Sequence, residues 1–220
     1  MSIVFSAFSP HPPILLPSVG AQKDRGKVKK TIKSLEDLGK KLKKINPDLI
    51  IISSPHPDWG FNVPLFFLAP NFKGKIQKIL IGSESPEFYY QQGKEFYKSG
   101  IQGPEPVEGC NLKSKISLIA SGDLSHYLKP EGPYGFNSQG PEFDKNLIEA
   151  LNEKDINKIL KLNEKFPEAG ECGLRSFSFI LGILEAHSAS SGLKWQPEIL
   201  SYEGPFGVGY LVADFKLKNN

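Results

Sequence analysis

Three of the four histidines follow short apolar segments of the kind that form buried strands. Each segment ends just before or a few residues before its histidine: residues 3–8 before His11, residues 48–53 before His56, and residues 116–120 before His126. A proline or glycine lies close to each histidine, which predicts a turn after each strand. Loops that follow parallel strands meet beyond the carboxyl ends of a sheet, where ligands bind. The spacing therefore predicts that these three imidazole rings share one site.

The tetrapeptide Ser-Pro-His-Pro occurs twice, at residues 9–12 and again at residues 54–57. It is too short to be a structural repeat. A single histidine after a strand is most often a hydrogen-bonding residue at the rim of a sheet, and this alternative applies to each of the three taken alone. Their joint placement favours a shared site, and we interpret the two tetrapeptides as similar turns that serve it.

Two neutral imidazoles and one carboxylate form the ligand set of many non-haem Fe(II) centres, and a similar set binds catalytic Zn²⁺. Three carboxylates are candidates for the third position: Asp58, Asp123 and Glu171. We favour Glu171 because it lies in Glu-Ala-Gly-Glu-Cys-Gly, at residues 168–173, where a predicted helix begins. Backbone N–H groups at a helix N-terminus would support a carboxylate that binds a metal.

Strands and helices alternate along the chain, which predicts an α/β fold. Further strands are expected at residues 76–81 and 206–217, and helices at residues 23–46, 86–97, 141–151, 155–163 and 173–187. We expect one domain over residues 1–220, with a mostly parallel or mixed sheet, helices on both faces and the site at the carboxyl ends of the strands. The loop at residues 127–140 suits a pocket wall or lid.

Composition and charge argue against several other classes of protein. Of 220 residues, 39% are hydrophobic, which is enough for a sizeable core, and the formal net charge of +3 does not indicate a nucleic acid partner. The two cysteines, Cys110 and Cys172, exclude a disulfide-rich scaffold and fit a reducing cytoplasm. We expect Cys110, in a Gly/Pro-rich loop, to be inert. No segment approaches the about eighteen apolar residues of a membrane span, and no signal peptide is recognisable.

Five motifs, spread in order along almost the whole chain, together resemble the LigB-like superfamily. They are Pro-His-Pro-Pro-Ile at residues 10–14, Ser-Pro-His at 54–56, Ser-Gly-Asp-Leu-Ser-His at 121–126, Gly-Glu-Cys-Gly at 170–173 and Tyr-Glu-Gly-Pro-Phe-Gly-Val-Gly-Tyr at 202–210. This superfamily contains the class III extradiol ring-cleavage dioxygenases and the related Memo-like proteins. The combination is far more specific than any single motif.

By position, the resemblance implies that His11 and His56 are iron ligands and that His126 is the catalytic acid/base. Ring-cleaving members use a glutamate before a glycine near the start of the last predicted helix, whereas Memo-like proteins have a cysteine there. This sequence has Glu171 and Cys172 side by side. We expect Glu171 to be the third ligand, because a carboxylate suits a hard Fe(II) site that uses O₂, and Cys172 remains the alternative.

Asp123 lies three residues before His126 in the same expected turn. We expect it either to orient His126 or to contact the substrate. The equally strong alternative is that its carboxylate caps the turn by accepting nearby backbone N–H groups.

The function that the resemblance implies is non-haem Fe(II)-dependent extradiol cleavage of a catechol-type aromatic diol by O₂. Two alternatives remain open: a Memo-like metal-binding accessory protein without ring cleavage, and, with weaker support, a Zn²⁺-dependent hydrolase. The expected partners are a small aromatic substrate and O₂, with no nucleic acid and no membrane. The resemblance also leaves open a second copy of the chain, or an AMMECR1-type domain, as a partner.

Overall fold

The computed structural model describes residues 2–101 and 114–219, so Cys110 lies outside the described residues. Within these ranges the strands form a single sheet in the order β3-β2-β4-β1-β6-β5. Their bounds are β1 (Ser2–Ser9), β2 (Leu49–Ser54), β3 (Lys75–Leu80), β4 (Lys115–Ser121), β5 (Lys194–Glu203) and β6 (Tyr210–Lys218).

Strands β1 to β4 run parallel, whereas β6 is antiparallel to both of its neighbours, β1 and β5. The sheet is therefore mixed, as expected. Since β2, β4 and β1 are adjacent and parallel, their carboxyl ends lie side by side at one edge of the sheet. The turns after these three strands carry the three histidines of interest.

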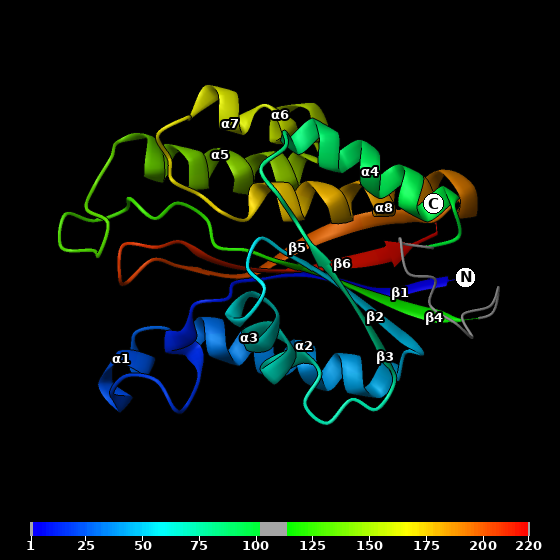
Figure 1. The fold of residues 1–220 in the computed structure, drawn as a ribbon, viewed down its shortest axis with the longest axis horizontal. Coiled ribbons are helices and arrows are strands. Elements are labelled where there is room, and N and C mark those ends of the chain that lie inside the picture. The colour runs from blue at the N-terminus through cyan, green and yellow to red at the C-terminus, as the bar shows by residue number, and fades with distance from the viewer. Residues whose placement is uncertain (1, 102–113, 220) are drawn as a thin grey trace.

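Helices cover both faces of the sheet, which confirms the predicted α/β fold (Figure 1). One face carries α1 (Gln22–Gly26), α2 (Lys29–Ile45) and α3 (Trp59–Leu68), and the other carries α4 (Pro86–Lys98), α5 (Gln139–Glu153), α6 (Ile156–Leu160), α7 (Leu162–Lys165) and α8 (Leu174–Ser191). A separate hydrophobic core fills each side. None of the described helices has the length and apolar character required to cross a membrane.

The prediction of one helix over residues 23–46 is wrong, because the chain breaks into α1 and α2 at Val28. Val28 is fully buried at this break. The Glu203 carboxylate accepts hydrogen bonds from the Thr31 backbone N–H at 2.8 Å and from the Thr31 hydroxyl at 2.7 Å. A distant side chain therefore caps the start of α2, which periodicity within the helix cannot reveal.

Two elements, α3 and β5, were not predicted from the sequence, and each contains a proline. Pro64 lies inside α3, where it removes one backbone hydrogen bond. Pro197 lies in β5, which is an edge strand and therefore tolerates a residue that cannot donate to the ladder. The last strand also begins at Tyr210, four residues later than predicted.

The predicted helix over residues 86–97 is confirmed as α4, with the Ser85 hydroxyl accepting a hydrogen bond from the Phe88 N–H. Gly93 has a structural reason to lie inside this helix. A Cβ atom at Gly93 would lie 2.0 Å from the Phe179 carbonyl oxygen of α8. Glycine thus lets α4 and α8 pack closely, and this packing helps to fix α8, whose N-terminus borders the histidine cluster.

Candidate metal centre

His11 is the most firmly held of the clustered histidines, with its side chain 2% exposed. Its Nδ1 atom lies 2.9 Å from the Ser121 hydroxyl, and its backbone N–H donates to the Asp123 carboxylate at 2.9 Å. Burial, together with the charge of the neighbouring His56, lowers the pKa of His11 to about 3. The ring is therefore neutral at physiological pH, which is the form that binds metals.

His56 reaches the same point from the turn after β2, but through different contacts. Its ring centroid lies 5.1 Å from that of His11 and 5.0 Å from that of Trp59, whose side chain is partly exposed. The Ser54 hydroxyl donates to the His56 carbonyl at 3.0 Å and accepts from the His56 N–H at 3.1 Å. The backbone of this turn is thus fixed by hydrogen bonds, and the ring is positioned by its neighbouring rings.

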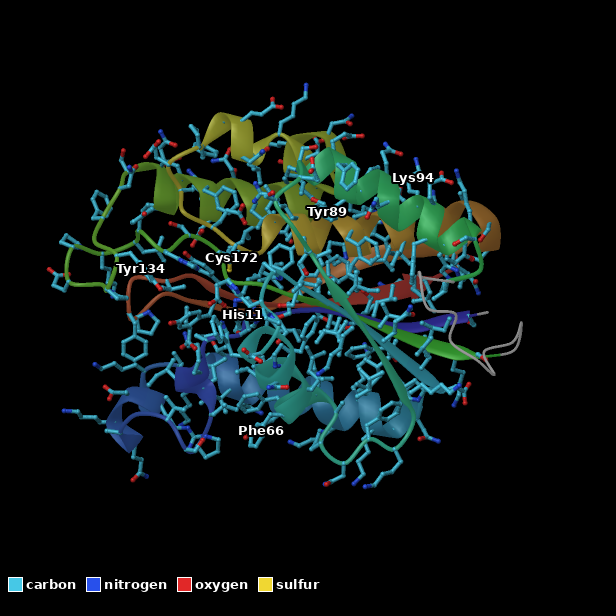
Figure 2. The ribbon with its side chains drawn as sticks, viewed as in Figure 1. His11, Phe66, Tyr89, Lys94, Tyr134 and Cys172 are labelled. Carbon is cyan, nitrogen blue, oxygen red and sulfur yellow. The ribbon has the colours of Figure 1, made fainter. Side chains whose placement is uncertain are left out.

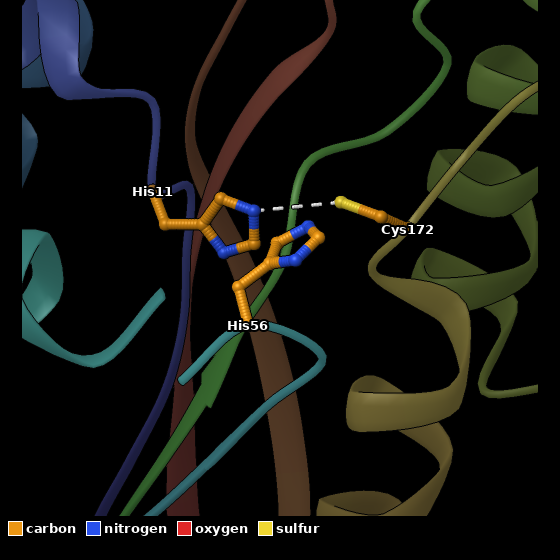
Figure 3. Close-up of side chains that lie close together, drawn as sticks. All are labelled: His11, His56 and Cys172. Carbon is orange, nitrogen blue, oxygen red and sulfur yellow. Dashed lines mark hydrogen bonds between the residues drawn. The ribbon is translucent and has the colours of Figure 1, made fainter. Parts of the chain in front are cut away.

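Cys172 completes the cluster from the residue pair that precedes α8 (Figures 2 and 3). Its Sγ atom lies 3.4 Å from His11 Nε2, and the candidate ligand atoms of Cys172, His11 and His56 all lie within 4.8 Å of one another. Burial, reinforced by the Asp123 charge, raises the pKa of the thiol well above its usual range. A bound cation would reverse this effect, because a coordinating thiol is deprotonated.

This donor set fits a transition metal ion. Two ligands on one tetrahedral ion, with nitrogen at about 2.0 Å and sulfur at about 2.3 Å, lie about 3.5 Å apart. The observed separation of 3.4 Å between His11 Nε2 and Cys172 Sγ agrees with that value. Two imidazoles and a thiolate are suited to zinc, copper and iron, and not to magnesium or calcium.

The turn that carries Cys172 lies directly against the turn after β4. The Gly173 N–H donates to the Asp123 carbonyl at 2.9 Å, and the Asp123 N–H points to the Cys172 sulfur at 3.4 Å. A Cβ atom at Gly122 would lie 2.2 Å from the Gly173 Cα. The two backbones therefore touch, and this contact fixes the sulfur beside His11.

Glu171, the carboxylate favoured from the sequence, makes other contacts. One of its oxygens accepts the Leu174 N–H at 2.6 Å, and the other lies 3.4 Å from Nη1 of Arg175. Both oxygens are thus engaged at the N-terminus of α8, where a carboxylate offsets the unpaired N–H groups. Among the described residues, the groups able to hold a metal ion contain Cys172 and not Glu171.

Asp123 lies at the centre of the site rather than at its rim. Its carboxylate bonds the His11 N–H, and one of its oxygens lies 3.8 Å from His11 Nε2. Burial raises the pKa of this carboxyl to about 6. Asp123 therefore organises the His11 turn and the Cys172 turn, in addition to lying near His126. The carboxylate Asp58, by contrast, is exposed at the start of α3.

His126 faces the same cluster from the turn after β4. Its ring forms a second candidate group with Asp123 and Cys172, again with ligand atoms within 4.8 Å of one another. Its Nε2 atom is buried and has no hydrogen-bond partner among the described residues. Tyr134, from the loop predicted to be a pocket wall, stacks on the ring with a centroid distance of 5.1 Å. Burial lowers the pKa of His126, and Asp123 partly opposes that effect.

A buried carboxylate, Asp144 in α5, supports the His126 turn and was not identified from the sequence. It accepts the Ser125 N–H at 2.8 Å and the Tyr202 hydroxyl at 2.6 Å. Burial raises its pKa to about 7. A signal was available, because Asp144 lies three residues before Leu147 on the apolar face of α5. Ser121, the partner of His11 Nδ1, carried no such signal.

Comparison with known proteins bears on the family of the chain. A family model described as "Catalytic LigB subunit of aromatic ring-opening dioxygenase" matches residues 56–213. Protein CA_C1420 of Clostridium acetobutylicum is 30% identical over 96% of this chain, which spans 57% of the length of that relative. The crystal structure of an uncharacterized protein, JW3007, from Escherichia coli K12 is similar with a TM-score of 0.59 at 12% identity, covering 96% of this chain and 98% of that one.

The similarity to the Escherichia coli structure concerns the fold alone at that level of identity. The family match includes His56, Asp123, His126 and Cys172, and covers well over half of the chain. The similarity to the relative from Clostridium acetobutylicum extends over nearly the whole sequence. This chain belongs to the LigB family.

Proposed function

We propose that this chain binds one divalent transition metal ion through His11 Nε2, His56 and Cys172 Sγ. The observation that supports the proposal is the convergence of these three donors, all within 4.8 Å of one another, at the carboxyl ends of adjacent strands. The third ligand in this proposal is Cys172 instead of Glu171, because both Glu171 oxygens are engaged at the α8 N-terminus. Iron is the metal that the family's dioxygenase chemistry favours.

The reaction we propose is the O₂-dependent opening of a catechol-type aromatic diol. When bound, the metal ion would increase the acidity of a diol hydroxyl and hold the diol for oxidation. His126 would accept the hydroxyl proton at Nε2, which is buried and has no hydrogen-bond partner among the described residues, in a ring that lies beside Asp123 and Cys172. Asp123 would stabilise the protonated imidazole, and the same His126 nitrogen would return the proton to the product.

Tyr134 gives this proposal a binding surface for an aromatic ring. Its side chain is largely exposed and stacks on His126 at an interplanar angle of 28°. Trp59 lies in a similar relation to His56, at an interplanar angle of 32°. Exposed aromatic faces beside the two histidines suit a flat aromatic substrate, since such rings stack favourably.

The second candidate function is metal binding without ring cleavage, as in the Memo-like proteins. The position of Cys172 favours it, because a thiolate replaces the carboxylate that the ring-cleaving members use, and it shifts the preference of the site toward softer metals. Because this chain spans 57% of the length of the relative from Clostridium acetobutylicum, the activity of a whole protein of that length is also a proposal.

Metal analysis of two neighbouring variants tests the ligand assignment. Cys172→Ala should lower the affinity for Fe(II) at least 100-fold, whereas Glu171→Gln, which keeps the size of the side chain, should stay within about threefold of the wild type. Anaerobic reconstitution followed by metal quantification gives the result. The opposite pattern would restore Glu171 as the ligand and contradict the proposed site.

A catechol panel separates the two functions. The reconstituted wild type should convert at least one catechol in the presence of O₂ to a yellow ring-opened product, and His126→Ala should bind iron but turn over about 10² to 10⁴ times more slowly. Iron binding with no turnover of any catechol would contradict the dioxygenase and support the second function. Full occupancy by zinc with ester or amide hydrolysis would indicate the hydrolase.

A further inference from the structure

A neutral imidazole carries one hydrogen, so a histidine that binds a metal through one nitrogen must hold its proton on the other. At His11 the nitrogen that faces Cys172 is Nε2, and Nδ1 faces the hydroxyl of Ser121 at 2.9 Å. Either atom of that second pair could supply the hydrogen. Which one does so decides whether Nε2 has a free lone pair.

The hydroxyl of Ser121 donates its proton to another acceptor. Ser121 Oγ also forms a hydrogen bond with the carbonyl oxygen of Gly60, and a carbonyl can only accept. A serine hydroxyl has one hydrogen to donate. With that hydrogen directed to Gly60, Ser121 can only accept from His11, so the hydrogen between them belongs to Nδ1.

The sequence explains why the Gly60 carbonyl takes part in this contact. Gly60 is the second residue of α3, and its carbonyl would ordinarily accept the N–H of the residue four positions later. That residue is Pro64, which has no N–H. The proline inside α3 thus removes the helical partner of Gly60, and the buried Ser121 hydroxyl supplies a donor to that oxygen.

We propose that Ser121 is a positioning residue that fixes His11 in the Nδ1–H tautomer and thereby makes Nε2 the metal-binding atom. The chain of hydrogen bonds runs from His11 to Ser121 and from Ser121 to the Gly60 carbonyl. Pro64 cannot donate to that carbonyl within the helix. The selection of a ligand atom rests on the proposed metal-binding function, whereas the tautomer itself does not. Outer partners of this kind tune the affinity of a histidine for its metal.

Nitrogen-15 NMR of the chelator-treated protein tests the tautomer without any metal. Long-range correlations between imidazole nitrogens and ring protons distinguish Nδ1–H from Nε2–H, and comparison with His11→Gln assigns the His11 signals. In the wild type, His11 should carry its proton on Nδ1. In Ser121→Ala, which removes the acceptor, a substantial share of the His11 population should carry it on Nε2.

The matched control is Ser117→Ala. Ser117 is a buried serine in the same strand, β4, and its hydroxyl has no hydrogen-bond partner among the described residues. Its removal should leave the His11 tautomer unchanged. Competition with a chromophoric chelator should show a 10- to 100-fold loss of Zn²⁺ affinity in Ser121→Ala. Ser117→Ala should stay within twofold of the wild type.

A wild-type His11 protonated on Nε2 would overturn the proposal, whether or not the variants fold. An unchanged tautomer in Ser121→Ala would overturn it as well. A shifted tautomer with unchanged Zn²⁺ affinity would refute the selection of the ligand atom. If the wild type binds no metal at all, the proposed function fails, and the NMR result still decides the role of Ser121.

Discussion

His11 and His56 lie in two copies of the tetrapeptide Ser-Pro-His-Pro, each at the end of a parallel strand. The protein nevertheless positions their rings through different contacts. His11 is buried, with Ser121 bonded to its ring and Asp123 to its backbone. His56 is only half-buried, and ring contacts with His11 and Trp59 position its imidazole.

This difference teaches that an identical local sequence sets the course of a turn but not the environment of its side chain. The serine of the tetrapeptide already makes different hydrogen bonds in the two copies, since Ser9 donates to the carbonyl of the next residue, Pro10, and Ser54 donates to that of His56. We infer that His11 is preorganised for binding, whereas His56 can adjust its ring. Three predictions test this contrast, and a further one extends the comparison to the His126 turn.

The largest expected effect is on metal affinity, and here the two turns should behave alike. His11→Ala and His56→Ala should each weaken the binding of Zn²⁺ or Fe(II) at least 100-fold, because each removes one of three ligands. His187→Ala is the control, since His187 lies in α8 and its ring bonds to Tyr97. Calorimetric titration would measure the change. If His56→Ala keeps wild-type affinity, the two turns do not share one ion.

The stability of the metal-free protein should separate the same two variants. His11→Ala leaves a buried space and deprives the Ser121 hydroxyl of a partner, so it should lower the free energy of unfolding by about 3 kcal/mol. His56→Ala removes a half-buried ring that has no comparable hydrogen bond within residues 2–101 and 114–219, and should cost about 1 kcal/mol or less. Urea denaturation in the presence of a chelator would measure both. Equal losses would remove the distinction between the turns.

The pH dependence of stability should distinguish the His126 turn from the His56 turn. The carboxylate of Asp144 bonds to the backbone of the first turn, and the hydroxyl of Ser54 bonds to the backbone of the second. Burial raises the pKa of Asp144 to about 7, so the folded protein binds this proton more tightly than the unfolded chain does. Stability due to Asp144 therefore falls as the pH rises from about 4 to about 7.

Asp144→Asn should remove that contribution. The decrease in the free energy of unfolding between pH 5 and pH 8 should become smaller than in the wild type by about 2 kcal/mol. Denaturation of the chelator-treated protein at both pH values is the measurement. The second variant, Tyr202→Phe, keeps the carboxylate but removes a hydrogen bond that lowers its pKa, so it should not reduce the pH dependence. A slope that matches the wild type would show that Asp144 titrates in its ordinary range.

The smallest effect should come from the hydroxyl that fixes the His56 turn. Ser54→Ala removes two hydrogen bonds to the backbone of that turn and should cost about 1 kcal/mol of stability. Because the His56 ring is positioned by ring contacts, metal affinity should fall less than tenfold. A loss as large as that of His56→Ala would show that the hydroxyl, and not ring packing, positions this ligand.

The sequence permitted a correct prediction of the α/β fold because apolar segments and helical periodicity mark its parallel strands and longest helices. It did not reveal the break before α2, since the cap comes from Glu203, far along the chain. The prolines in α3 and β5 argued against a helix and a strand in the sequence. Whether a proline is tolerated depends on the neighbouring elements in the fold, which the local sequence does not show.

For the site, the strand-end positions predicted that His11, His56 and His126 lie near one another, and the structure places each of them in a group with Cys172. The choice between Glu171 and Cys172 depends on one residue of register at the start of α8. That register is set by backbone contact between Gly122 and Gly173, about which composition and periodicity carry no information. The role of Ser121 is hidden for a similar reason, because its partners lie 61 and 110 positions away.

The order of the strands has a consequence for how the chain acquires its shape during synthesis. β1 emerges from the ribosome before the other strands of the sheet, but its two neighbours are β4 and β6. One side of β1 must wait for residues near 115–121, and the other for residues near 210–218. Contacts so distant in sequence close slowly and leave apolar edges unpaired meanwhile. A nascent chain that is stalled before β6 should therefore be prone to aggregation and dependent on chaperones.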